Sequence, residues 1–304
     1  MMEEPVYHIP ALLPQCLDAL DIRPDGVYVD ATLGGGGHSG AIAARLTTGH
    51  LYSLDRDSEA IARATATAVF TPVHGDFRHL ANYMRYFGVL GGVDGILADL
   101  GVSFHHFDDA SRGFSFRTDA PLDMRMNPDG GMTAAELLRS VSEDRLAEIF
   151  RLYGELRQGR RIAAAITRRL ASGGRVERTG ELVDTVTPLL NPASLKKELA
   201  QVFQALRIEV NGEMEALEAF LRASLQALRP GGRLAVISYH SLEDRLVKNF
   251  MRSGRTDGVV EKDLFGRADV PLKALTSKPV IPDADEIERN PRSRSAKLRV
   301  AVKL

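Results

Sequence analysis

The segment Asp30-Ala-Thr-Leu-Gly34-Gly35-Gly36-Gly37-His38-Ser39 lies between a β-type apolar run, Val27-Tyr28-Val29, and a helical pattern over residues 39–46. Glycine residues let a backbone turn tightly and approach a ligand closely. The segment also begins where a strand would end, and open α/β sheets bind their ligands at the carboxyl ends of strands. We therefore predict a ligand-binding loop at the carboxyl end of the first strand.

Apolar runs and helical patterns alternate on both sides of this loop. Such alternation is typical of βαβ units and predicts an α/β fold with a doubly wound, mostly parallel sheet. Pro72 lies in the third run, and because proline cannot donate a ladder hydrogen bond, that strand is expected at or near a sheet edge. The predicted strands are 27–30, 51–55, 71–74, 95–100, 233–240 and 297–303, and the predicted helices among them are 39–46, 60–68, 214–228 and 242–252.

The middle of the chain breaks this alternation. Residues 102–132 are rich in Gly, Asp, Phe, Pro and Met, which predicts a long ordered loop. Thr133-Ala-Ala-Glu136 is a capping-box pattern, and apolar residues then recur at helical spacing. We predict a Rossmann-like core over 1–132 and 211–304, with an inserted all-helical domain over 133–210. Scattered Pro and Gly predict loops over 254–296.

Composition excludes several classes of protein. The 304 residues are 44% hydrophobic and 26% charged, which is too apolar for a disordered chain. Cys16 is the only cysteine, so intramolecular disulfides and cysteine-based metal clusters are excluded. The sequence has no apolar run of about 18 residues and no signal-peptide pattern at its start, so we expect a cytoplasmic protein without a membrane partner. Adjacent ligand types at 105–106 and 108–109 rarely face one ion, and we expect no metal site.

The formal net charge of −1 hides local asymmetry. Residues 151–175 carry seven arginines against one acid, and residues 289–304 carry six Lys and Arg residues and no acid. Two basic segments on a neutral chain favour an anionic partner at one face. Solvated helix faces and a basic tail are the alternative interpretation.

The second strand ends in Asp55, about 20 residues after the glycine loop, where a carboxylate can accept both hydroxyls of a ribose. This combination predicts an adenosine-type cofactor. The tract 34–37 has glycine at the first and third positions of the dinucleotide pattern Gly-x-Gly-x-x-Gly, but Ser39 occupies the sixth. S-adenosylmethionine has no phosphate, and Asp30 can attract its ammonium or sulfonium. We therefore favour S-adenosylmethionine; a dinucleotide, another ligand or a structural turn are the alternatives.

Two further features favour a methyltransferase. In His74-Gly75-Asp76-Phe77, after the third strand, an acid and an aromatic ring can flank an adenine, although an ordinary turn fits equally. Residues 228–238, Leu-Arg-Pro-Gly-Gly-Arg-Leu-Ala-Val-Ile-Ser, resemble the helix–turn–strand entry of Rossmann-like methyltransferases at the level of fold.

The glycine loop and six further blocks, in this order along nearly the whole chain, closely resemble the ribosomal RNA small subunit methyltransferase H family, also called MraW. These blocks are His8-Ile-Pro-Ala-Leu-Leu, Asp99-Leu-Gly-Val-Ser103, Asp108-Asp-Ala-Ser-Arg-Gly-Phe-Ser-Phe116, Pro121-Leu-Asp-Met-Arg-Met126, Ile237-Ser-Tyr-His-Ser-Leu-Glu-Asp-Arg245 and Asn290-Pro-Arg-Ser-Arg-Ser-Ala-Lys-Leu-Arg299.

The resemblance implies a class I methyltransferase core with an inserted helical substrate domain. It implies methylation at N4 of a cytidine in the decoding centre of 16S rRNA, within the small ribosomal subunit, with S-adenosylmethionine as donor. The family's cofactor positions map onto Gly36, Gly37, His38, Asp55, Phe77 and Asp99. A further position falls on His106, where the family commonly has Gln, and imidazole replaces only part of an amide's hydrogen bonding.

The chemistry of this reaction singles out the ends of two strands. The exocyclic amine of cytosine is a poor nucleophile, so the main task is in-line placement of amine and methyl, worth up to ~7–11 kcal/mol. Asp99 ends the fourth strand and is expected to orient the amine, although Asp99-Leu-Gly-Val replaces the Asp/Asn-Pro-Pro-aromatic pattern of many amino-methyltransferases. Tyr239 and His240 end the fifth strand and are candidate catalytic residues lining the base pocket; packing under a loop is the alternative.

RNA contacts are expected from aromatic and arginine side chains. An unstacked base can stack on phenylalanine, and the planar arginine fork suits phosphate. Each phenylalanine has packing in a hydrophobic core as its alternative, and each arginine a surface ion pair. The stacking candidates are Phe104, Phe107, Phe114 and Phe116, and the phosphate candidates are Arg112, Arg125, Arg157, Arg160, Arg292 and Arg294.

Two functions of other classes remain open from the sequence. One is a non-catalytic ribosome-assembly factor that binds the cofactor only as a structural ligand, and the other is a nicotinamide oxidoreductase. The intact glycine tract, Asp55 and Asp99 favour catalysis over a binding module. The sequence leaves a homodimer possible.

Overall fold

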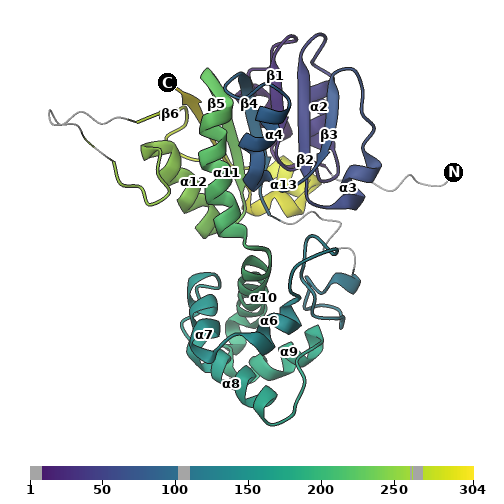
Figure 1. Cartoon of the computed structure of the whole chain (residues 1–304). Helices are drawn as coiled ribbons and strands as arrows, with labels where there is room; N and C mark the ends of the chain where they lie inside the picture. The colour runs from purple at the N-terminus through teal and green to yellow at the C-terminus, as the bar shows by residue number, and fades with distance from the viewer. Residues whose placement is uncertain (1–8, 102–109, 261, 263–269) are drawn as a thin grey trace. The chain divides into compact units, whose positions relative to one another are not determined.

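Short apolar segments form one seven-stranded sheet in the computed structural model, which describes residues 9–101, 110–260, 262 and 270–304 (Figure 1). Across the sheet the strand order is β3-β2-β1-β4-β5-β7-β6. The first five strands in this order pair in parallel, whereas β7 is antiparallel to both β5 and β6. The doubly wound, mostly parallel sheet is therefore confirmed. The strands are β1 (Val27–Asp30), β2 (His50–Asp55), β3 (Phe70–His74), β4 (Val93–Asp99), β5 (Leu228–Ser238), β6 (Leu272–Ala274) and β7 (Lys297–Lys303).

The strand order reverses beside β1. The chain runs outward from β1 through β2 to β3, and then returns to β4 on the other side of β1. Ligands of doubly wound sheets bind at this switch point, outside the carboxyl ends of the strands. Asp30 pairs with Leu97, so the ends of β1 and β4 lie side by side. The expected edge strand is confirmed, because β3, which contains Pro72, is the outermost strand of the sheet, next to β2.

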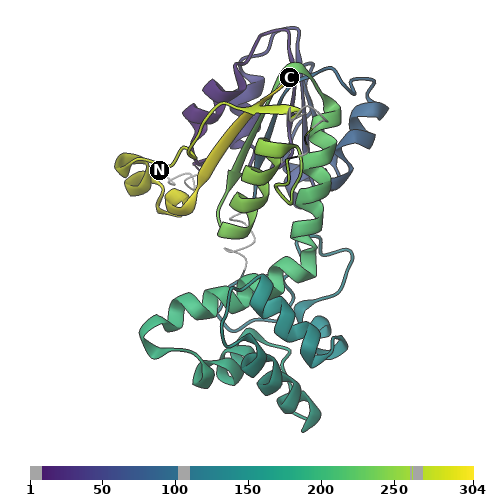
Figure 2. The ribbon, with the colours of Figure 1, turned by 90° about the vertical axis from the view of Figure 1, so that its left-hand side faces the viewer.

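Helices cover both faces of the sheet, as Figure 2 shows for the core seen from the side. Apolar side chains from α4, α11 and α12 pack on one face, and those from α1 and α2 pack on the other. Strand β5 is buried on both faces, because Val236 joins the first cluster and Ile237 the second. The α-helices described in residues 9–101 and 213–304 are α1 (Leu13–Leu20), α2 (Gly37–Ala43), α3 (Ser58–Arg63), α4 (Leu80–Tyr86), α11 (Glu213–Ala227), α12 (Ser241–Ser253) and α13 (Ala284–Arg289).

The prediction of loops throughout residues 254–296 is wrong in two places. Lys273 and its neighbours form β6, which pairs with β7, and α13 follows with Asp283 as its N-cap. Asp283 accepts a hydrogen bond from the amide of Glu286. A strand of three residues and a helix of six are too short to show a period, so neither was detectable from spacing.

Residues 102–213 form a second compact unit, the helical unit; the core unit comprises 1–101 and 214–304. The Thr133 capping box is confirmed, since the amide of Glu136 donates to Thr133 Oγ1 and the amide of Thr133 donates to Glu136 Oε2. Among the described residues, no helix of either unit has both the length and the apolar character needed to cross a bilayer. The helices here are α6 (Ala134–Ser140), α7 (Glu143–Leu152), α8 (Gly159–Ala171), α9 (Thr179–Val186) and α10 (Leu195–Asn211).

The helical unit begins about thirty residues earlier than the predicted boundary at 133. Phe114, Leu122 and Met124 are buried in the hydrophobic core of the helices. Asn211 ties the same segment to α10, because its Oδ1 accepts from the amide of Met126 and its Nδ2 donates to the carbonyl of Met124. These hydrogen bonds join residues more than 80 positions apart, so a local pattern could not show them.

Candidate active site

The carboxylate of Asp30 anchors the glycine loop to the end of β1. The side chain is fully buried, and its Oδ2 accepts a 2.6 Å hydrogen bond from Ser39 Oγ on α2. Its Oδ1 accepts from the amide of Thr32. Burial raises the pKa of Asp30 above its usual range. Asp30 therefore holds both ends of the loop that the sequence assigned to the cofactor.

The glycine loop depends on backbone conformations that other residues rarely adopt. Gly34 and Gly36 have φ angles of 49° and 79°, in the left-handed region. Asp55 fixes the loop from β2, because its Oδ2 accepts a 2.8 Å hydrogen bond from the amide of Gly34. Gly37 is needed for a different reason, since a Cβ there would lie 2.9 Å from the ring of Pro10. Gly35 lies exposed between them.

His38 presents a lone pair toward the end of β4. Its ring is buried, and its Nε2 lies 3.1 Å from the carbonyl oxygen of Ala11. Because a carbonyl only accepts, Nε2 must carry the hydrogen, and burial lowers the pKa of the imidazole, which favours its neutral form. Nδ1 is then an acceptor, 3.7 Å from Asp99 Oδ2.

Asp99 is the centre of this constellation. Its backbone amide donates to Thr32 Oγ1 at 2.7 Å, which ties the end of β4 to the glycine loop. The hydroxyl of Tyr239, at the end of β5, donates to Asp99 Oδ1 at 2.8 Å. Burial raises the pKa of Asp99 to about 7; the hydrogen bond from Tyr239 lowers this pKa and the nearby Glu243 carboxylate raises it.

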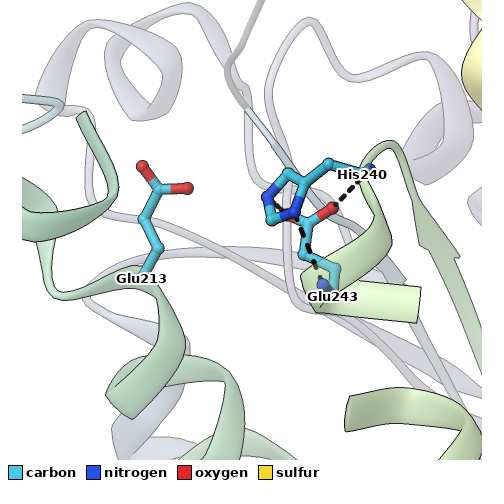
Figure 3. Close-up of side chains that lie close together, drawn as sticks. All are labelled: Glu213, His240 and Glu243. Atoms are coloured by element: carbon cyan, nitrogen blue, oxygen red, sulfur yellow. Dashed lines mark hydrogen bonds and ion pairs between the residues drawn. The ribbon is translucent and has the colours of Figure 1, made fainter. Parts of the chain in front are cut away.

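His240 and Glu243 form the corner between β5 and α12 (Figure 3). The amide of Glu243 donates to His240 Nδ1, and the amide of His240 donates to Glu243 Oε2. His240 Nε2 lies 3.2 Å from Glu243 Oε1, without hydrogen-bond geometry. Sequence reasoning missed Glu243, although its spacing of three residues from His240 is that of a capping box.

Phe77 and its neighbour Asp76 lie at the end of β3. Phe77 is half-buried, and its ring meets Phe220 edge-on at 5.2 Å between centroids. The side chain of Asp76 accepts from the amide of Arg78 and forms an ion pair with the Arg78 guanidinium at 3.0 Å. Contacts of both residues with an adenine stay a prediction.

Several predicted site residues lie outside the described part of the chain. They are His106, the possible ligands His105, Asp108 and Asp109, and the stacking candidates Phe104 and Phe107. Of the other stacking candidates, Phe114 is buried in the core of the helical unit, and Phe116 meets Phe203 edge-on.

The arginines proposed for RNA binding fall into two groups. Arg112 donates to the carbonyls of Arg125 and Met126, and Arg125 forms a bidentate pair with Asp123, so both stabilise the segment before α6. The other four are exposed: Arg157 and Arg160 at the start of α8, and Arg292 and Arg294 on the turn before β7. Arg160 lies 3.6 Å from an equally exposed Asp144.

Comparisons with known proteins match the whole chain. The model of the MraW methylase family matches residues 5–304. A protein of Phocaeicola vulgatus named ribosomal RNA small subunit methyltransferase H is 53% identical over 98% of this chain and 98% of its own length. A protein of the same name from Porphyromonas gingivalis is 51% identical over 99% of this chain and 98% of its own.

Solved structures are more distant. TrmN from Thermus thermophilus aligns at a TM-score of 0.44 and 14% identity, over 96% of this chain and 48% of its own. An rRNA methylase from Streptococcus thermophilus aligns at 0.39 and 13%, over 98% and 99%. The family match and the full-length relatives carry the assignment: this chain belongs to the MraW methylase family.

Proposed function

We propose that this protein transfers a methyl group from S-adenosylmethionine to N4 of a cytidine in the decoding centre of 16S rRNA, within the small ribosomal subunit. The observation that supports it best is full-length similarity, above 50% identity, to proteins named for methylation of small-subunit rRNA. The largely buried carboxylate of Asp99 at the sheet's switch point supports the choice of an amine as acceptor.

The residues present suit S-adenosylmethionine. Asp30 and Asp99, at adjoining strand ends, and the Nδ1 atom of His38, in the first turn of α2, are hydrogen-bond acceptors. Such groups favour a cationic ligand that carries an ammonium and a sulfonium. Asp55 lies at the end of β2, where it can accept ribose hydroxyls, and Gly36 leaves the loop backbone open, since a Cβ there would meet nothing closer than 4.0 Å. A pyrophosphate would instead require a set of donors.

Asp99 carries the chemistry of the acceptor. When bound, S-adenosylmethionine supplies a methyl group activated by a sulfonium. Asp99 Oδ2 accepts an N–H of the cytosine amine, which turns the nitrogen lone pair away from the ring and toward the methyl carbon. As the N–C bond forms and the C–S bond breaks, positive charge develops on N4, and the carboxylate stabilises it. The product cation is acidic, so the departing proton needs no strong base.

The helical unit offers the phosphate-binding surface. Arg157 just before α8 and Arg160 in its first turn are exposed, as are Arg161 and Arg168. Ala164 and Ala165, between the latter two, leave their face of α8 uncrowded. Arg161 and Arg168 are seven residues apart, which is two helical turns and about 10 Å along the axis. This spacing lets two arginines contact separate phosphates of one RNA strand.

Methylation of unmodified small subunits tests the proposal. The full chain, tritiated S-adenosylmethionine and subunits are incubated, and the modified nucleotide is mapped. We expect tritium at N4 of one decoding-centre cytidine. Subunit binding without transfer would identify an assembly factor, hydride transfer to a nicotinamide would identify an oxidoreductase, and methylation of another atom would overturn the choice of N4.

A further inference from the structure

Glu243 is a buried carboxylate that the proposed methyl transfer does not yet use. It lies in the first turn of α12, and its side chain is only 3% exposed. Its Oε2 accepts a 2.9 Å hydrogen bond from the amide of Tyr239 and a longer one from the amide of His240. Because these amides belong to successive residues, the carboxylate fixes the path of the chain where β5 gives way to α12.

This corner decides where the ring of Tyr239 lies. The Tyr239 amide is held by Glu243, and its hydroxyl donates to Asp99 Oδ1 at 2.8 Å. The ring also passes close to Gly101, where a Cβ would lie 3.3 Å from Tyr239 Cδ2. Gly101 has a φ of 106°, so side chains are disfavoured there for a second reason. Tyr239 is therefore held at its backbone, its ring and its hydroxyl.

The hydroxyl of Tyr239 bonds to one oxygen of Asp99 and leaves the other oxygen to bind the acceptor amine. Oδ1 receives the tyrosine hydrogen bond, whereas Oδ2 faces the ring of His38. A carboxylate fixed at one oxygen cannot rotate freely about its Cβ–Cγ bond. Tyr239 thus fixes the direction of Oδ2, the atom to which we assign the amine.

We propose that Tyr239 and Glu243 are a pair of positioning residues that act through Asp99. Tyr239 fixes the Asp99 carboxylate and favours its ionised form. Glu243 holds Tyr239 in place and disfavours the ionised form of Asp99. The inference rests on the proposed function in assigning the amine to Asp99. In this proposal Tyr239 holds Asp99 in place, instead of lining the base pocket as expected from the sequence.

Electrostatics give the two residues opposite effects on Asp99. A hydrogen bond to a carboxylate stabilises its charged form, whereas a second buried carboxylate destabilises it. Accordingly Tyr239 lowers the pKa of Asp99 and Glu243 raises it. Other titratable groups near this network are Asp30 from β1, His38 from α2, the thiol of Cys16 from α1, Glu286 from α13, and His240, whose Nε2 lies 3.2 Å from Glu243 Oε1. None of them changes in the variants below.

Titration of Asp99 in the full chain tests the pair directly. Aspartate carboxyls are labelled with carbon-13, and the Asp99 signal is assigned by its absence from Asp99→Asn. We expect Tyr239→Phe to move the titration midpoint upward and Glu243→Gln to move it downward, each on the order of one pH unit. Glutamine keeps an oxygen for the Tyr239 amide, so Glu243→Gln removes the charge while preserving the corner.

Matched controls have the same chemical change at exposed positions. Tyr86→Phe on α4 and Glu215→Gln on α11 should leave the midpoint where it is in the unaltered protein. In methylation assays the acid limb of kcat should shift in the same two directions, with KM for S-adenosylmethionine changing less than kcat. A purely structural role would lower activity without these opposite shifts.

The outcomes separate this inference from the proposed function. Midpoints that do not move, or that move in the same direction, overturn the positioning pair whatever the protein methylates. If the unaltered protein methylates no cytidine, the proposed function fails, and the Asp99 titration alone decides whether the pair exists. Circular dichroism of each variant confirms that the comparison is made on folded protein.

Discussion

Asp99 shows how a buried carboxyl is kept at a cost in stability. The residue ends β4 in a closely packed part of the core unit, where burial raises its pKa to about 7. A carboxyl in the unfolded chain titrates near 3.8. Ionising Asp99 in the folded protein is therefore less favourable than ionising it in the unfolded chain. The fold tolerates this cost because Tyr239 donates to the carboxylate.

We predict that Asp99→Asn stabilises the protein at neutral pH while it abolishes most activity. Between about pH 4 and pH 7 the folded state binds more protons at Asp99 than the unfolded state, so the stability of the unaltered protein falls as pH rises through this window. The variant lacks this group. Its advantage in free energy of unfolding should therefore grow by about 2–3 kcal/mol between pH 5 and pH 8, as measured by urea denaturation.

Turnover of the same variant tests the role of the carboxylate. The asparagine amide still fits the site, but its oxygen is a weaker hydrogen-bond acceptor than a carboxylate and carries no charge to stabilise the developing cation. We therefore expect kcat to fall roughly 10²-fold or more. Cofactor affinity, measured by calorimetry, should fall much less. Unchanged turnover with intact affinity would remove Asp99 from the reaction.

Asp55 carries a separate prediction, because its two oxygens shape the cofactor loop. One accepts from the amide of Gly34 and the other from the amide of Asp57. Asp55→Ala removes both bonds and the proposed acceptor for ribose, so affinity for S-adenosylmethionine should fall at least tenfold, which corresponds to about 1.4 kcal/mol. Asp25→Ala, at an exposed position, is the control and should bind normally in the same calorimetric titration.

At the scale of elements, α12 is held to the sheet by an ion pair. Arg299 of β7 is 8% exposed and donates through Nε and an Nη atom to both oxygens of Asp244, at 2.7 and 3.1 Å. Asp244 follows Glu243 in the first turn of α12. The pair therefore links the strand beside β5 to the helix that carries the proposed positioning carboxylate.

We predict that Arg299→Met destabilises the core unit by about 3 kcal/mol, because it leaves the half-buried Asp244 without its principal partner. The double variant with Asp244→Asn should recover part of this loss. Arg222→Met breaks only an exposed ion pair on α11 and should change stability by less than about 0.5 kcal/mol. If Arg299→Met and Arg222→Met lowered the free energy of unfolding equally in urea denaturation, the Arg299–Asp244 pair would contribute no more to stability than an exposed ion pair.

The elements also show where sequence reasoning ends. Residues 95–98 of β4 and 234–237 of β5 form apolar runs because both faces of these strands are buried, and the polar residues that follow placed Asp99 and Tyr239 each at the end of a strand. The structure adds that these two strands are neighbours in the sheet. The hydrogen bond between these two residues was not predictable, since it joins positions 140 apart. Glu243 was missed because histidine is an uncommon N-cap, so the capping pair of His240 and Glu243 was not recognised at the start of the helix predicted over 242–252.

The whole molecule consists of two units whose chemistry differs. Acidic strand ends and the glycine loop belong to the core unit, whereas the arginine-rich segment 151–175 belongs to the helical unit. The arginine-rich segment lies inside the insertion predicted from the helical pattern, but that pattern placed the boundary too late, because residues such as Phe114 enter the core of the helices without any helical period of their own. Burial of that segment is a property of the folded unit and not of its local sequence.

The two units should therefore respond independently to charge reversal. We predict that Arg157→Glu with Arg160→Glu weakens binding to small subunits at least tenfold. The slope of the logarithm of the binding constant against the logarithm of the salt concentration should become less steep by about 0.7 to 0.9 for each phosphate that is no longer neutralised. Affinity for S-adenosylmethionine should not change. The matched control, Arg85→Glu with Arg222→Glu, places the same charge change on exposed positions of core-unit helices and should bind subunits normally. Filter binding across a salt series measures the affinity for small subunits, and calorimetry measures the affinity for S-adenosylmethionine. Equal losses of both affinities in the double variant would count against α8 as the phosphate-binding surface. An equal loss of subunit affinity in the control variant would count against it as well.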